Sequence, residues 1–152
     1  MTRPAVCVTT VRDRSAVSNW DRRGGLMHRD RWSRPVIAAA TEVHRILGPG
    51  LPETVYKVAL AEELRRRSIP FERDKTVPIR YRDLVLVTGL HLDLVVGSEL
   101  IVDAISVGRI TQWHRARLAT HVKLSGCPLG LLINFNVPVL KRGVRRLKPP
   151  PV

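Results

Sequence analysis

The sequence predicts a mixed α/β domain, because the spacing of its apolar residues changes part-way along the chain. From Ser33 to about Arg67, apolar residues recur every three or four positions, which is typical of helices packed on one side. From Val77 onward, short runs alternate apolar and polar residues, as half-buried strands do. One more helical segment follows at 111–125. The expected order of elements is therefore α-α-β-β-β-β-α-β.

Two helices are expected in the first half of the chain. The first begins near Ser33, which can cap it, and ends at the Gly-Pro-Gly turn at 48–50. The second runs from Pro52 to about Arg67. Its buried side carries Tyr56, Leu60 and Leu64, which are spaced four residues apart. We expect Tyr56 to be a core residue with a hydrogen-bonded hydroxyl, because a buried phenol needs a polar partner.

The residue pattern in the second half of the chain predicts a sheet. Polar turns separate its strands, and a helix with Thr111 as its cap and Gly126 at its end precedes the last apolar strand. At most one short edge strand follows before a Pro-rich tail. The expected strands are 77–81, 84–88, 91–96, 99–106 and 129–135, with the possible edge strand at 144–147.

The positive charge of the chain is concentrated at its two ends. The 152 residues include 26 basic and 13 acidic side chains, a net charge of +13. Residues 1–34 and 140–152 each carry a net +5, and the residues between them carry +3. Basic ends either bind phosphate backbones or remain solvated. We expect a basic, poorly ordered extension at 1–33, a folded domain at 34–147 and a Pro-rich tail at 148–152.

Composition excludes several classes of protein. Apolar residues make up 44% of the chain, too many for a wholly disordered protein. No apolar run approaches the roughly 20 residues of a membrane-spanning helix, and the N-terminus lacks the apolar segment of a secretory signal. Cys7 and Cys127 are too few for a disulfide framework or a Cys-rich zinc site. We expect a cytoplasmic protein without a membrane segment, with Met1 or Met27 as its start.

Two aspartates are expected to meet on a central hairpin. The segments 91–96 and 100–105 each place alternate apolar residues on one face, and keeping both apolar sets together fixes the register. Asp93 then opposes Asp103 across a three-residue loop at 97–99, with the two Cβ atoms about 5 Å apart. A divalent cation such as Mg²⁺ would compensate this like-charge pair. The alternative is that one carboxylate pairs with an arginine or faces water.

Residues 50–56, with the sequence GLPETVY, resemble the motif that names the GxxExxY protein family. The resemblance covers about residues 35–147, and that family is assigned to the PD-(D/E)XK nuclease-like superfamily. It implies a restriction-endonuclease-like core with a four-stranded mixed sheet flanked by helices, an active site on the central hairpin, and metal-dependent cleavage of phosphodiesters. The further matching blocks, in the same order, are 42–44, 47–50, 91–96, 123–126 and 131–138.

Carried over residue by residue, the resemblance implies that Glu53, Asp93 and Asp103 are the acidic site residues and the ligands of Mg²⁺. The motif also requires a lysine two positions after Asp103, and this chain has Ile105 there. Isoleucine can neither stabilise charge on a phosphate nor help to activate water. A plain alternative for Glu53 is stabilisation by the dipole of its own helix, without any metal.

The missing lysine leaves two interpretations of the site. Either the site is degenerate, or another cation replaces the lysine. Arg117 and His121 stand where the family usually has Gln and Tyr, and Arg117 could reach a phosphate. His91 could act as a base or metal ligand. We expect a nuclease-like protein with impaired catalysis that binds DNA or RNA; the alternatives are a non-enzymatic nucleic-acid-binding domain and a partner-binding domain that reuses the fold.

Overall fold

A computed structural model describes residues 30–148 of the chain. The expectations for residues 1–29, including the alternative start at Met27, and for residues 149–152 lie outside the described residues. Within that part, helices and strands follow the expected α/β order. The helices are α1 (Ser33–Leu47), α2 (Glu53–Arg66) and α3 (Gln112–Ser125), and the strands are β1 (Phe71–Tyr81), β2 (Leu84–Val96), β3 (Leu100–Ile105), β4 (Leu129–Asn134) and β5 (Val144–Leu147).

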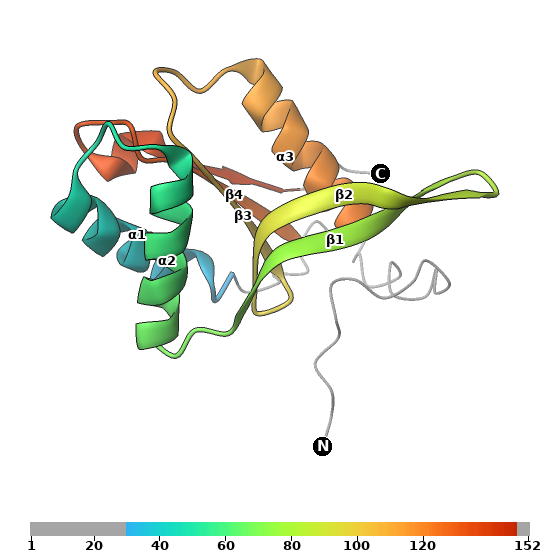
Figure 1. The fold of residues 1–152 in the computed structure, drawn as a ribbon, viewed down its shortest axis with the longest axis horizontal. Coiled ribbons are helices and arrows are strands. Elements are labelled where there is room, and N and C mark those ends of the chain that lie inside the picture. The colour runs from blue at the N-terminus through green and yellow to red at the C-terminus, as the bar shows by residue number, and fades with distance from the viewer. Residues whose placement is uncertain (1–29, 149–152) are drawn as a thin grey trace, which may run out of the picture.

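The five strands form one mixed sheet in the order β1-β2-β3-β4-β5. All neighbours are antiparallel except β3 and β4, which are parallel and are joined by a crossover through α3. The helices α1 and α2 pack on one face of the sheet and α3 packs on the other (Figure 1). This arrangement confirms the predicted α/β fold class and is compatible with a restriction-endonuclease-like core.

The number of strands differs from the prediction. The segments 84–88 and 91–96, expected as two strands, form the single long strand β2. Gly89 does not end the strand; it lets β1 approach closely, since a Cβ at this position would lie 2.7 Å from the backbone nitrogen of Ile79. The β1–β2 ladder also shifts register beside Ile79. The possible edge strand at 144–147 exists as β5, so the sheet has five strands.

The helix ends agree with the sequence except at the first cap. Ser33 is the first residue of α1, and its backbone N–H donates to Asp30 Oδ1 at 2.9 Å. The Asp30 carboxylate therefore accepts from the start of the helix, as the Ser33 hydroxyl was expected to do. At the start of α3, the backbone N–H of Thr111 donates to His114 Nδ1 at 3.0 Å. Gly126 ends α3 in the left-handed conformation that glycine adopts without strain.

Tyr56 joins three parts of the fold. Its hydroxyl donates to the carbonyl of Gly48 at 2.5 Å and accepts from the backbone N–H of Leu51 at 3.1 Å. Its ring is fully buried and stacks on Phe135, with centroids 4.5 Å apart. The end of α1, the start of α2 and the residue after β4 are therefore held together by one side chain, as a buried and hydrogen-bonded tyrosine should do.

Tyr56→Phe should lower the free energy of unfolding by about 1–3 kcal/mol, because it leaves a backbone carbonyl and a backbone N–H without their shared partner. Urea unfolding followed by circular dichroism measures this. Tyr81→Phe is the matched control, since Tyr81 lies exposed at the end of β1 and its change should have no measurable effect. Equal stability of both variants would contradict the anchoring role of the Tyr56 hydroxyl.

Candidate active site

The β2–β3 hairpin brings two aspartates together. The ladder pairs Leu94 with Val102 and Val96 with Leu100, which is the register that the sequence predicts. Asp93 and Asp103 lie one position beyond the last of these pairs. The Asp103 side chain is 4% exposed, and that of Asp93 is 20% exposed. Burial and the neighbouring Asp103 carboxylate raise the pKa of Asp93 despite the opposing effect of Lys57.

Two cations compensate the acids, one from each helix layer. From α3, the guanidinium of Arg117 lies 2.6 Å from Asp103 Oδ2. From α2, Lys57 Nζ lies 3.0 Å from Asp93 Oδ2 and 2.6 Å from Glu53 Oε1. Three acids and two cations therefore form one contiguous cluster with a formal charge of −1.

Both cations remain charged at neutral pH. Burial works to lower the pKa of Lys57, but the hydrogen bonds and ion pairs with Glu53 and Asp93 outweigh it and raise that pKa. The pKa of Arg117 is raised in the same way, because its pairing with Asp103 outweighs the effect of burial. Neither side chain is therefore suited to accept a proton, and both can stabilise negative charge.

Arg117 is held in place by more than its ion pair. Its guanidinium carbon lies 5.1 Å from the ring centroid of Trp113, a distance typical of a cation–π contact. The buried Arg117 Nε has no hydrogen-bond partner within residues 30–148, while the side chain as a whole is 30% exposed. His121 lies one turn further along α3, and burial followed by the charge of Arg117 lowers its pKa. The α3 face that the sequence singled out therefore contributes to the cluster through Arg117.

The structure brings four of the five predicted site residues together: Glu53, Asp93, Asp103 and Arg117. His91 lies elsewhere: its Nε2 is 3.5 Å from Asp74 Oδ1 on β1, and its side chain is 59% exposed. On β2, His91 pairs with Thr76 of β1, while the ladder from β2 to β3 ends before it. The role of His91 as a base or metal ligand stays a prediction.

The position of the missing motif lysine is closed to solvent. Ile105 is 1% exposed and belongs to the apolar cluster that α3 forms with the sheet. No polar group is presented to the acids from this position. A side chain at this position therefore lies among apolar groups.

Lys57 is the member of the cluster that the sequence analysis missed. The signal was present, because a lysine four residues after Glu53 lies on the same face of the predicted helix. Lysine is also scarce in this chain, with five Lys against 21 Arg. What the sequence pattern does not contain is the contact between α2 and the central hairpin, which places Lys57 beside Asp93.

The donor atoms of the cluster fit a divalent cation in part. Carboxylate oxygens are the ligands that Mg²⁺ takes, often from only one or two protein side chains. Asp93 and Asp103 meet this requirement. Within the part of the chain that the structure describes, no three His, Cys, Asp or Glu side chains are grouped as a metal site would group them. Glu53 instead contacts Lys57.

Comparison with known proteins decides the family. A family model for the PD-(D/E)XK nuclease superfamily matches residues 30–147, which is nearly all of the described domain. This chain belongs to the PD-(D/E)XK nuclease superfamily. No curated protein and no solved structure gives a significant match. In this PD-(D/E)XK protein, no helix among residues 30–148 is long and apolar enough to span a bilayer.

Asp93→Asn should increase the stability of the PD-(D/E)XK domain at pH 7. A raised pKa means that the folded state holds the proton more tightly than the unfolded state, so ionised Asp93 opposes folding above that pKa. The neutral amide removes this effect. The urea midpoint, measured in EDTA, should rise at pH 7, and the gain should shrink below the ordinary aspartate pKa of 3.8, where both states are protonated.

Asp83→Asn is the matched control for this measurement, because Asp83 lies exposed in the turn between β1 and β2. Its urea midpoint should stay at the wild-type value across the same pH range. A lower midpoint for Asp93→Asn at pH 7 would contradict the prediction, since it would mean that the ion pair with Lys57 outweighs burial and the repulsion from Asp103.

Proposed function

We propose that this chain is a GxxExxY-type member of the superfamily and a Mg²⁺-dependent phosphodiesterase that acts on nucleic acid, with Glu53, Asp93 and Asp103 as its acidic residues. The observation that carries the proposal is the convergence of Asp93 and Asp103 on adjacent strands of a PD-(D/E)XK domain. Lys57 and Arg117 compensate these carboxylates only in part, because the cluster of three acids and two cations keeps a formal charge of −1. The presence of both carboxylates is accounted for by a ligand that needs them.

A divalent cation is the ligand that suits this pair. Asp93 and Asp103 would hold it, and the net negative charge of the cluster would attract it even with Lys57 and Arg117 in place. When bound, the cation would supply a Lewis acid beside a phosphodiester. Glu53, at the first turn of α2, would complete the acidic surface on the side facing Lys57.

The chain's own groups would orient the substrate. Arg117, whose side chain is 30% exposed, would donate from its guanidinium to a phosphate oxygen while Asp103 and Trp113 fix that group. Asp103 is buried and so keeps a fixed position. The loss of a charge at Ile105 should slow the reaction, since one missing electrostatic contact commonly costs about 10²–10³ in rate. We therefore propose a slow nuclease, with DNA and RNA both as candidate substrates.

Cleavage of labelled DNA and RNA oligonucleotides by the full chain in Mg²⁺ tests this function. We expect slow cleavage that EDTA stops and that Asp93→Asn reduces at least about 10²-fold. Because Asp93→Asn should keep or improve stability, its loss of activity cannot be assigned to unfolding. Asp83→Asn is the control and should cleave at the wild-type rate. Cleavage that survives in Asp93→Asn would identify a contaminant and overturn the proposal.

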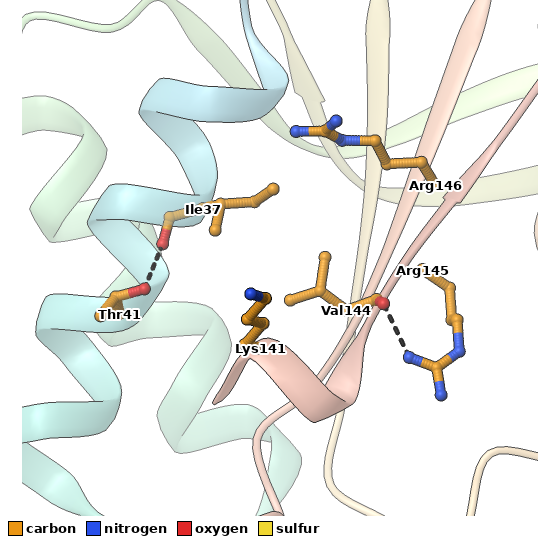
Figure 2. Close-up of a pocket in the computed structure, with 6 residues that line it drawn as sticks. All are labelled: Ile37, Thr41, Lys141, Val144, Arg145 and Arg146. Atoms are coloured by element: carbon orange, nitrogen blue, oxygen red, sulfur yellow. Dashed lines mark hydrogen bonds between the residues drawn. The ribbon is translucent and has the colours of Figure 1, made fainter. Parts of the chain in front are cut away.

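A basic hollow favours a second candidate, binding of nucleic acid without cleavage. A cavity of about 670 Å³ lies between α1 and the edge of the sheet at β5 (Figure 2). Three of its six lining residues are cations and none is an acid. A phosphate backbone is the partner that such a surface would attract. The lining residues are Ile37, Thr41, Lys141, Val144, Arg145 and Arg146.

Replacing Lys141 and Arg146 together by alanine should weaken binding of an oligonucleotide in Ca²⁺, because the hollow then attracts phosphate less strongly. The slope of log K against log salt should fall by about 1 for each phosphate that the two side chains neutralise in the wild type. Fluorescence anisotropy at several salt concentrations measures both quantities. The matched control replaces Arg65 and Arg66, two exposed arginines of α2 that pair with Glu62. An unchanged affinity and slope in the Lys141/Arg146 variant would exclude the hollow as a binding surface.

A further inference from the structure

Lys57 differs from the other cations of α2 and its C-terminal end. Arg65, Arg66 and Arg67 form ion pairs with acids of α2, and their side chains are more exposed than that of Lys57. The Lys57 side chain is only 24% exposed and contacts an acid of its own helix together with Asp93 of β2. An ordinary helix-surface pair needs no second acid from the sheet. The position of Lys57 is therefore set by the acid cluster.

The Lys57 ammonium also lies beside acids that lack the lysine of the superfamily motif. The superfamily pattern places a lysine on the same strand as Asp103, at the position of Ile105, and that side chain is buried in the apolar cluster on the α3 side. Lys57 approaches from the opposite helix layer, and its Nζ lies 3.0 Å from Asp93 Oδ2. The acids thus have a lysine ammonium beside them, although it comes from another element.

We propose that Lys57 of α2 is the catalytic lysine of this site, replacing from the helix the amine that the strand lacks at Ile105. This inference rests on the proposed nuclease function. In the hydrolysis, a water oxygen forms a bond to phosphorus, the bond from phosphorus to the leaving oxygen breaks, and the proton released by the water reaches the leaving oxygen through solvent. The Lys57 ammonium donates hydrogen bonds to a non-bridging phosphate oxygen and stabilises the charge that develops there.

The competing explanation is that Lys57 only neutralises Glu53 and Asp93. The two explanations predict different consequences of removing the charge while keeping the apolar stem. If Lys57 only neutralises the acids, Lys57→Met leaves catalysis intact or improves it, because a divalent cation no longer competes with the ammonium. If Lys57 contacts the phosphate, Lys57→Met removes an interaction that is strongest in the transition state.

Lys57→Met and Lys57→Arg in the full chain, compared with wild type, test the proposal. Single-turnover cleavage of an oligonucleotide in saturating Mg²⁺ should fall about 10²–10³-fold in Lys57→Met and by less in Lys57→Arg, which keeps the charge. Binding of the same oligonucleotide in Ca²⁺ should weaken several-fold in Lys57→Met, with a salt slope lower by about 1. Thermal melting of each variant establishes that it is folded at the assay temperature.

Lys75→Met is the matched control. Lys75 is a similarly buried lysine, with a side chain 17% exposed and Nζ 2.8 Å from Glu72, but it lies on β1 outside the acid cluster. Its cleavage rate and salt slope should equal those of wild type. An active wild type with unchanged cleavage in Lys57→Met overturns the role of Lys57 alone. A wild type that cleaves nothing overturns the nuclease function, and the Ca²⁺ binding data then decide whether Lys57 contacts phosphate: an unchanged salt slope overturns that contact too.

Discussion

Two carboxylates side by side on neighbouring strands repel each other, and the arrangement of the rest of the domain supplies the positive charge that lets them stay. Asp93 and Asp103 come together because the apolar faces of β2 and β3 fix the hairpin register. Each helix layer then contributes one cation, Lys57 from α2 and Arg117 from α3. The cluster consequently lies where both layers reach the same part of the sheet, and it depends on the correct docking of both.

The docking of α2 depends on a residue that takes no part in the charge cluster. Tyr56 ties the start of this helix to the end of α1 and to the residue after β4. Its neighbour in sequence, Lys57, instead reaches Asp93. The start of α2 therefore combines two tasks: tyrosine fixes the helix, and the fixed helix delivers Glu53 and Lys57 to the sheet. An anchoring residue and two charged residues lie within about one turn of helix because their side chains leave it in different directions.

The features of the fold and the site that the sequence predicts are those that depend on residues close together in the chain. The register that joins Asp93 to Asp103 was predictable, because the alternation of apolar residues in two adjacent segments contains it. The fusion of two expected strands into β2 was not predictable. Gly89 continues the strand because Ile79 of β1 packs closely against it, and that contact is not visible in the local sequence. The role of Lys57 was missed for the same reason: its pair with Asp93 joins α2 to β2 across many residues, and no local pattern records it.

The burial of Ile105 also limits which side chains this position accepts. Its side chain lies in the apolar cluster on the α3 side, where full burial of an aliphatic residue stabilises a fold by roughly 1.5–3 kcal/mol. A lysine at this position would now have to place an ammonium in apolar surroundings, which costs several kcal/mol unless the neighbours change as well. A single Ile105→Lys substitution would therefore carry a cost in stability. A cation reaches the acids without that cost from the helices, as Lys57 and Arg117 do.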